Sequence, residues 1–343
     1  MQKWKYKRLF LRFAAVSLCL VVIYLIALCD YNHQQKSLLS IRPTTRFLNG
    51  TSFARVHFRL YMGHILVTVH INGHAQECVL DTGATTTHVT HPDDISTEAF
   101  KAGLFRSIGP PVPGCAPRAL GVMIIHSVQI GDYMVENVPV CSYKQLPSDP
   151  FSVRKPILGN DLFRNVAVTI DCRSATLLIA LPSSDQAPSR TIGWDQTLEF
   201  QSNILPGPDN LVLLHGIVAH SPSLLVFDTG QFLEPLAVVD RTLAKRIAIE
   251  TGVKSQDNVQ LLENVSWSVA GTQFHTMVVI DTRFPKPFQA LVGTPYLLLY
   301  RVGIDYPAHR LYLHRYRSTE PFTKDAQLER ILYFSNEQRA DGK

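Results

Sequence analysis

Apolar and polar residues alternate in short runs through much of this chain, which is the pattern of half-buried β-strands. One such run covers residues 65–71. Asn72 and Gly73 come next, a pair that favours the two-residue turn of a β-hairpin. A second run, residues 77–80, would return along the hairpin and end at Asp81. Runs of this kind predict an all-β fold.

The chain also contains an internal repeat. Residues 157–180 align with residues 291–314 without a gap. In addition, an apolar strand-like run ends in Asp-Thr-Gly twice, once at Asp81 and once at Asp228. Duplication of one unit explains both observations. We therefore expect two similar β-lobes, each built from short strands and turns.

Composition and patterning divide the chain into six parts. A helix is expected at residues 240–251, where apolar residues recur at helical spacing. The predicted parts are a basic stub with a transmembrane anchor (1–30), a stalk (31–50), an N-terminal lobe (51–182), a Pro/Ser-rich linker (183–196), a C-terminal lobe (197–316) and a tail with a short helix (317–343).

The positive charge of the chain is concentrated at its N-terminus. Five of the 33 basic residues precede any acidic residue, and the other 28 equal the 28 acidic residues in number. The body is therefore neutral, and nucleic acid is not an expected partner. Residues 13–29 carry no charge, so we expect a single-pass membrane protein, anchored by an N-terminal helix. Basic residues would keep residues 1–12 in the cytoplasm and place the body outside it; a cleaved signal peptide is the alternative.

Four cysteines lie in the first half of the body: Cys78, Cys115, Cys141 and Cys172. No Cys-x-x-Cys pair is present, which argues against zinc or thioredoxin-like chemistry. Four cysteines allow three disulfide pairings. Small buried thiols in strands are the alternative to disulfides.

The two Asp-Thr-Gly sequences suggest a specific chemistry. Two carboxyl groups held close together share a proton, because both cannot ionise cheaply. One of them can then act as a general base and the other as a general acid, with no metal or cofactor. The glycine would allow close approach of its N–H group to the carboxylate. The threonine hydroxyl could donate a hydrogen bond to the other lobe.

These residues resemble the aspartic proteases, specifically the retropepsin-like superfamily, in a tandem two-lobed arrangement. The resemblance covers most of residues 55–315 and includes Leu80 to Thr85, Val128 to Gly131 and Ile157 to Leu162. It implies two retropepsin-like β-barrel lobes that form a pseudo-dimer within one monomer, with an active-site cleft between them. It also implies a polypeptide substrate. The implied catalytic residues are Asp81 and Asp228, and the supporting residues are Thr82, Gly83, Ala84, Thr229, Gly230, Gln231, Gly159 and Gly293.

The sequence departs from the family pattern after each Asp-Thr-Gly. The family usually has Ala, Ser or Thr there, and this chain has Ala84 and Gln231. Without a hydroxyl to stabilise the charged carboxylate, its pKa should rise, which predicts activity at mildly acidic pH. Two alternatives remain open: a catalytically degenerate module that binds peptides or a partner, and a single active lobe that needs homodimerisation. A mobile cover over the cleft is expected near residues 107–122.

Other clusters of polar residues are not expected to form a catalytic or metal site. Asp171 and Asp305 recur between the two repeats, but each ends a strand and is expected to be a turn residue. His88, His91, Asp93 and Asp94 fit no zinc spacing and are expected in a solvated turn.

Overall fold

Strands are the main regular element of the described residues in the structure, a computed structural model, which confirms the all-β expectation. The structure describes residues 17–18, 21–26, 29–30, 33, 37–38, 40–90, 115, 119, 121–143, 155–202, 211–231, 235–251, 259–281 and 288–317. The predicted tail helix at 317–343 lies outside these residues, apart from Arg317.

The first half of the chain contains ten strands and two short 3-10 helices among its described residues. They are β1 (Thr44–Phe47), η1 (Leu48–Gly50), β2 (Phe53–Tyr61), β3 (His64–Ile71), β4 (His74–Leu80), β5 (His88–Thr90), β6 (Gly121–Ile130), β7 (Tyr133–Tyr143), β8 (Ile157–Leu158), η3 (Asn160–Leu162), β9 (Ala167–Asp171) and β10 (Thr176–Ala180).

The second half repeats the order of strands from β2 to β10 and has, in addition, an α-helix among its described residues. Its elements are β11 (Gln196–Glu199), β12 (Leu213–Val218), β13 (Ser221–Phe227), β14 (Leu236–Val238), α2 (Arg241–Thr251), β15 (Val259–Val269), β16 (Thr272–Asp281), β17 (Ala290–Val292), η4 (Thr294–Leu298), β18 (Tyr300–Asp305) and β19 (Arg310–Arg315).

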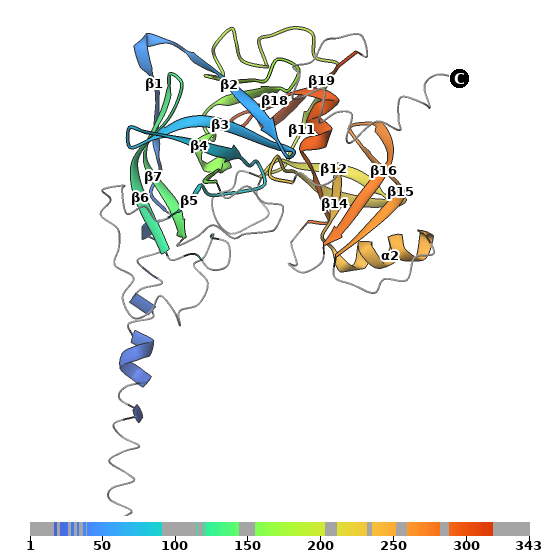
Figure 1. The fold of residues 1–343 in the computed structure, drawn as a ribbon, viewed down its shortest axis with the longest axis horizontal. Coiled ribbons are helices and arrows are strands. Elements are labelled where there is room, and N and C mark those ends of the chain that lie inside the picture. The colour runs from blue at the N-terminus through green and yellow to red at the C-terminus, as the bar shows by residue number, and fades with distance from the viewer. Residues whose placement is uncertain are drawn as a thin grey trace, which may run out of the picture.

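Six strands of each half pair in the same way. In the second half β12, β13, β17, β14, β16 and β15 form a closed barrel. In the first half β3, β4, β8, β5, β7 and β6 make the equivalent six pairings, and these strands belong to a 13-stranded sheet. Figure 1 shows the two groups on opposite sides of the molecule, with β18, β19 and β11 between them.

The two halves meet at β9 and β18, which pair antiparallel. Val168 lies opposite Ile304, and Ile170 lies opposite Val302. Because the sequence repeat equates Val168 with Val302 and Ile170 with Ile304, each pair is the other with its partners exchanged. This is the self-complementary register of a two-fold axis, here within one chain.

The segment 183–196 packs on this central pairing. Ala187 is fully buried against Ala167 and Ala180 from the first half. Pro188 lies against Gly303 of β18, so closely that a Cβ there would come within 2.8 Å of it. Trp194 donates from Nε1 to the Pro188 carbonyl at 2.9 Å. The segment is therefore a strap across the strands that join the two halves.

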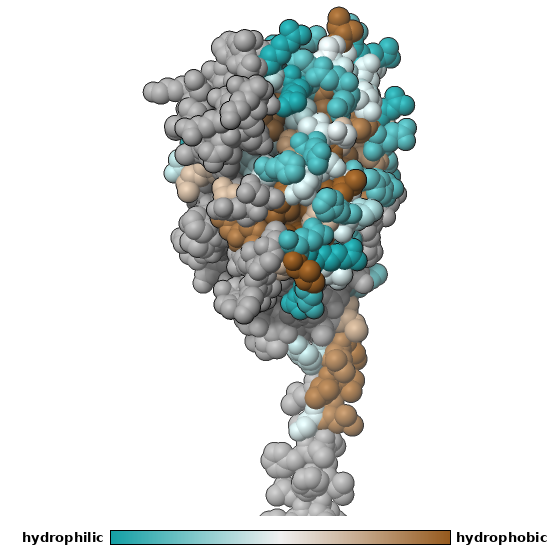
Figure 2. Space-filling view, turned by 90° about the vertical axis from the view of Figure 1, so that its right-hand side faces the viewer, coloured by the Kyte–Doolittle hydropathy of each residue, from teal (hydrophilic) through white to brown (hydrophobic). Residues whose placement is uncertain are grey.

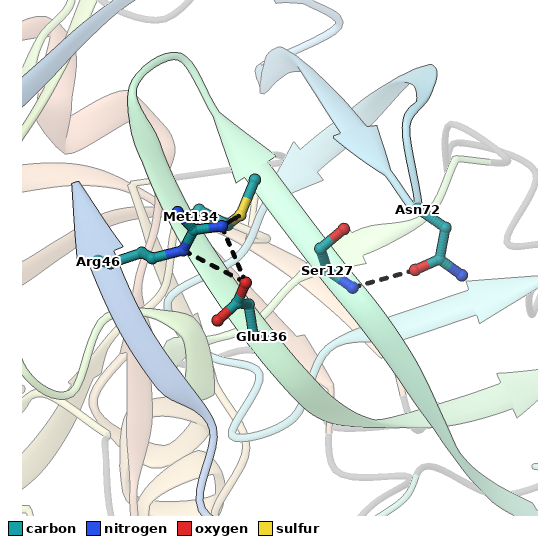
Figure 3. A network of polar contacts seen from close by, with 5 residues as sticks. All are labelled: Arg46, Asn72, Ser127, Met134 and Glu136. Carbon is teal, nitrogen blue, oxygen red and sulfur yellow. Dashed lines mark hydrogen bonds and ion pairs between the residues drawn. The ribbon is translucent and has the colours of Figure 1, made fainter. Parts of the chain in front are cut away.

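The hairpin expected at Asn72 forms between β3 and β4. Asn72 and Gly73 both have positive φ, 49° and 84°, as the favoured two-residue hairpin turn requires. The Asn72 side chain also accepts a hydrogen bond from the Ser127 N–H of β6 at 3.0 Å (Figure 3). This bond holds the turn against a third strand, β6. It thereby helps to fix the position of β4 and of Asp81, which directly follows that strand.

The edge strand β1 is attached to β7 by its backbone pairing and by one ion pair. Arg46 contacts Glu136 at 3.0 Å and also donates to the Met134 sulfur at 3.2 Å (Figure 3). Both charged side chains are more than a third exposed. An exposed pair of this kind contributes about 0–1 kcal/mol, so the backbone pairing is the main attachment.

The expected helix is present as α2. Asp240 precedes it and accepts a hydrogen bond from the Leu243 N–H at 2.7 Å, which is the contact of an N-cap residue. Leu243 and Ile247 are buried against the second barrel, whereas Ile249 is 80% exposed. The helix covers the lower side of the second-half barrel in Figure 1.

The structure contains both a disulfide and buried thiols, the two alternatives considered for the cysteines. Cys115 and Cys141 form a disulfide. Cys78 and Cys172 are reduced and fully buried. Burial raises the pKa of the Cys78 thiol to about 12, so it remains protonated as a small apolar residue.

The predicted membrane anchor is wrong. Among the described residues, no helix is long and apolar enough to cross a membrane. The segment at residues 21–26 is helical. Its apolar side chains are exposed and form the brown segment beneath the body in Figure 2. The predicted single-pass arrangement, with residues 1–12 in the cytoplasm and the body on the other side of the membrane, depends on this anchor and is therefore also wrong.

Candidate active site

The two Asp-Thr-Gly sequences begin where strands β4 and β13 end. Each strand runs parallel to a short partner, β8 or β17, from the sequence repeat. Asp81 donates its N–H to the Leu158 carbonyl at 3.0 Å, and Asp228 donates its N–H to the Val292 carbonyl at 2.9 Å. Both aspartates are thus placed by the same construction, a strand end attached to a neighbouring strand.

Thr82 and Thr229 join the two strand ends. Each threonine N–H donates to the other hydroxyl at 3.0 Å. The Thr82 hydroxyl then donates to the Phe227 carbonyl at 2.8 Å, and the Thr229 hydroxyl donates to the Leu80 carbonyl at 2.6 Å. Both side chains are buried, so these four bonds are shielded from water. They fix the distance between the two halves at the aspartates.

Each aspartate carboxylate is oriented by its own loop. Asp81 Oδ1 accepts hydrogen bonds from the N–H groups of Gly83 and Ala84, at 2.9 and 3.0 Å. Asp228 Oδ1 accepts from the N–H groups of Gly230 and Gln231, at 2.8 and 3.2 Å. The two arrangements are equivalent, and in both only the second carboxylate oxygen is left for other partners.

The glycines let the two carboxyl groups approach. A Cβ atom at Gly83 would overlap the Asp228 carboxyl group, and one at Gly230 would lie 2.5–2.6 Å from the Asp81 carboxyl atoms. Each carboxyl group therefore occupies the space that a side chain on the opposite glycine would fill. Asp81 and Asp228 also hydrogen-bond to each other through their carboxyl groups.

The surroundings raise the pKa of Asp81 well above its usual value. Burial is the largest cause, followed by the charge of Asp228 and the hydrogen bond with it. The N–H groups of Gly83 and Ala84 act in the opposite direction and offset only part of the rise. Asp81 and Asp228 retain some solvent exposure. The site therefore combines two adjacent carboxyl groups, one with a raised pKa, with partial exposure to solvent.

A second layer of contacts supports both loops. Asn160 donates its N–H to the Ala84 carbonyl at 2.8 Å and its side-chain Nδ2 to the Thr82 carbonyl at 2.5 Å. Thr294 does the same in the other half, donating its N–H to the Gln231 carbonyl at 2.7 Å and its hydroxyl to the Thr229 carbonyl at 2.6 Å. These residues follow the two glycines that the sequence repeat equates.

Gly159 and Gly293 have the same backbone geometry. Their φ and ψ angles are −85° and 174° at Gly159, and −88° and 176° at Gly293. A Cβ at Gly159 would come within 2.6 Å of the Thr86 backbone, so β8 passes directly beside the Asp81 loop. The structure thus brings together all ten residues expected in the site; a catalytic role for Asp81 and Asp228 stays a prediction.

The two halves differ after the Asp-Thr-Gly sequence. Ala84 has no polar side chain, whereas the Gln231 side chain has a buried Nε2 atom without a hydrogen-bond partner among the described residues. A buried donor without a partner costs about 1–3 kcal/mol. The difference between Ala84 and Gln231 is therefore confined to the Asp-Thr-Gly loop of the second half.

Several residues of the site were not expected from the sequence, namely Asn160, Thr294, Asp161 and Thr87. A usable signal existed for the first two, because both are polar and directly follow an equivalent glycine in the repeat. The expected cover at 107–122 lies mostly outside the described residues, which include Cys115, Ala119 and the start of β6.

Asp171 and Asp305 are turn residues, as expected. Asp171 Oδ1 accepts from the N–H groups of Arg173 and Ser174, at 3.0 and 3.3 Å. Asp305 Oδ1 accepts from the Ala308 N–H at 3.0 Å. His91, Asp93 and Asp94 lie outside the described residues, whereas His88 belongs to β5 and lies 5.2 Å from the Tyr143 ring, so the expected solvated turn is wrong for His88.

Comparison with known proteins adds no assignment: no family model matches this chain, and no curated protein matches it in sequence.

Proposed function

We propose that this protein is an aspartic endopeptidase in which Asp81 and Asp228 activate a water molecule to hydrolyse peptide bonds. One observation carries the proposal: the two carboxyl groups pack against each other's Asp-Thr-Gly loop in equivalent positions, and burial with the neighbouring charge raises the pKa of Asp81. This is the environment in which two carboxyl groups share one proton.

The chemistry follows from one proton on the pair. The ionised carboxylate accepts a proton from water, whose oxygen attacks the peptide carbonyl carbon, while the other carboxyl donates its proton to the carbonyl oxygen. The C–N bond of the tetrahedral intermediate then breaks as the nitrogen takes up the proton derived from water. A hydroxyl proton returns to the second carboxylate, and the pair regains its starting state.

The fold supports a two-lobed, retropepsin-like arrangement with both lobes in one chain. The supporting features are the repeated order of strands, the six equivalent pairings in each half and the two-fold register of β9 with β18. In this proposal the protein acts as a monomer, and an extended polypeptide binds between the lobes. The reaction needs no cofactor, because general acid–base catalysis by the two carboxyls is sufficient.

The proposal is tested with the full-length chain and an unfolded protein substrate over a pH series. Asp81→Asn and Asp228→Asn should each abolish cleavage while the protein remains monomeric. If only Asp81 is needed and the active species is a dimer, a single-lobe protease that functions as a homodimer replaces the proposal. If the wild-type chain cleaves nothing but binds peptides, a degenerate binding module replaces it, with Gln231 as the first residue to examine.

A further inference from the structure

Asp161 is a buried carboxyl group next to the candidate active site that the proposed chemistry does not use. It lies in η3 and is only 4% exposed. Its Oδ2 atom accepts a hydrogen bond from the Thr87 N–H at 3.0 Å, and its Oδ1 atom accepts one from the Thr87 hydroxyl at 2.8 Å. The same hydroxyl accepts a hydrogen bond from the Gly159 N–H at 3.2 Å. Thr87 is thus held on three sides.

Thr87 is the far end of the loop that contains Asp81. The loop leaves β4 at Asp81 and joins β5 directly after Thr87. Gly159 packs against the Thr86 backbone, and Asn160 binds the carbonyl groups closest to Asp81. Three consecutive residues, 159–161, therefore support the loop along its whole length, and Asp161 provides the contact farthest from β4.

The second half of the molecule lacks this contact. The sequence repeat places Pro295 at the position of Asp161, and proline has no carboxylate. Nevertheless β13, β17 and β14 pair in the same way as β4, β8 and β5. The buried carboxylate is therefore not required to form this arrangement of strands, and its presence in one half only calls for another explanation.

The raised pKa of Asp161 also predicts a cost in stability at neutral pH. Burial raises the pKa of Asp161 to about 6, although the bonds from Thr87 and the positive charge of Arg164 favour the ionised form. Tyr133, on β7, is another titratable group near this carboxylate; burial is the main cause that raises its pKa, and the charge of Asp161 adds to the rise. A carboxyl group with a raised pKa contributes stability at acidic pH and loses it as the pH rises through about 6. Destabilising groups of this kind are typically retained where function depends on them.

We propose that Asp161 is a positioning residue for Asp81, because its carboxylate fixes the far end of the Asp81 loop through both hydrogen-bond donors of Thr87. This inference rests on the proposed function of the Asp81–Asp228 pair. Asp161 does not contact the reacting atoms, so its effect reaches them only through the loop. Protonation of Asp161 replaces one acceptor by a donor and weakens the attachment.

The test uses full-length Asp161→Asn, which imitates the protonated form, and measures kcat and KM on a peptide substrate between pH 4 and 8. We expect kcat at pH 7 to fall roughly 10- to 100-fold, the effect of a small misplacement of a catalytic group, with little change in KM. In the wild type the acid limb of kcat should lie near pH 6, at the pKa of Asp161. In the variant this limb should be absent, and the urea midpoint at pH 7 should be higher than in the wild type.

Two variants of the partner residue separate positioning from folding. Thr87→Ser keeps both donors and should lose much less kcat than Thr87→Val, with the acid limb still present. Thr87→Val keeps the N–H but removes the hydroxyl, so kcat should fall between those of the wild type and Asp161→Asn. Asp171→Asn serves as a matched control, because that carboxylate accepts two backbone hydrogen bonds in the turn after β9 and a third from the Tyr316 hydroxyl. It should lower stability without moving the acid limb.

The inference is overturned if Asp161→Asn lowers the urea midpoint at pH 7 and leaves kcat and the acid limb unchanged, since that would be a purely structural role. If the wild-type chain has no peptidase activity, the proposed function fails separately, and amide hydrogen exchange decides the positioning role. Asp161→Asn should then speed exchange in residues 82–87 relative to residues 229–231. Equal exchange in both loops would overturn the inference.

Discussion

Thr82 and Thr229 each donate a backbone N–H to the hydroxyl of the other at 3.0 Å, although 147 residues separate them in the chain. The two hydroxyls continue to the carbonyl groups of Phe227 and Leu80. This exchange is symmetric, so neither half provides the framework for the other. Its consequence is that Asp81 and Asp228, one residue earlier, are brought together by buried bonds.

Removing either hydroxyl should weaken the protein by a similar amount. Thr82→Val and Thr229→Val keep the β-branched shape but leave a buried N–H and a buried carbonyl without their partner. We expect each to lower the free energy of unfolding by about 1–3 kcal/mol. Urea denaturation measures this loss, and Thr82→Ser, which keeps the hydroxyl, should lose much less. A clear difference between the two valine variants would contradict the symmetric interpretation.

Adding a methyl group at either glycine should separate the two carboxyl groups. A Cβ at Gly83 would overlap the Asp228 carboxyl, and one at Gly230 would overlap that of Asp81. We expect Gly83→Ala and Gly230→Ala to reduce kcat/KM by roughly 100-fold or more, because the reacting groups are displaced. Gly271→Ala is the control: its φ of 72° makes the substitution strained, but nothing lies within 4 Å of the added Cβ. It should cost stability and leave kcat/KM of the folded protein unchanged.

The parts of the fold that could be predicted are those that depend on neighbours in the sequence. The hairpin at Asn72-Gly73 was predictable because only residues tolerant of positive φ suit its turn. Asp81 and Asp228 were identifiable because each ends an apolar run with the same tripeptide. The equivalence of Gly159 and Gly293 came from an ungapped repeat. The first two signals lie within a few residues, and the third is a direct comparison of two stretches of the sequence.

Contacts between distant residues could not be predicted in this way. The repeat shows that Asn160 and Thr294 follow equivalent glycines, but only the structure shows that an amide and a hydroxyl donate to equivalent carbonyl groups of the two loops. The strap at 183–196 has the composition of a free linker, and only the structure shows Pro188 packed on Gly303. The membrane anchor was predicted from an uncharged run and the basic residues before it, and among the described residues no helix is long and apolar enough to cross a membrane.

The raised pKa of Asp81 predicts a particular dependence of stability on pH. A carboxyl group whose pKa is higher in the folded state contributes stability below its unfolded pKa and loses it as the pH rises through the folded pKa. Asp81→Asn should therefore have a higher Tm than the wild type at pH 7, and the difference should shrink as the pH falls toward 4. Thermal unfolding across this range measures the effect. A lower Tm for Asp81→Asn at pH 7 would contradict the assigned environment.

The same pair limits the pH range of activity, together with Asp161, to which the acid limb near pH 6 is assigned. Because Asp81 holds its proton more strongly than an ordinary aspartate, the singly protonated pair should persist at mildly acidic pH. We expect a bell-shaped profile of kcat/KM with its maximum on the acidic side of neutrality. Initial rates on a peptide substrate, corrected for the folded fraction at each pH, measure this profile. A maximum below about pH 3 would contradict the prediction, since an unperturbed acid pair would then be sufficient.

Gln231 differs from Ala84 in having an amide whose Nε2 atom is buried and lacks a partner among the described residues. Gln231→Ala removes that atom and makes the second loop resemble the first, while the backbone bonds to Asp228 and Thr294 remain. We therefore expect the free energy of unfolding to stay the same or to rise, by up to about 1–3 kcal/mol. Gln201→Ala, at an exposed site, is the control and should change it by less than about 0.5 kcal/mol. If Gln231→Ala is instead clearly destabilising in urea denaturation, the amide has a partner in solution, and the second loop depends on a contact that the first loop does not need.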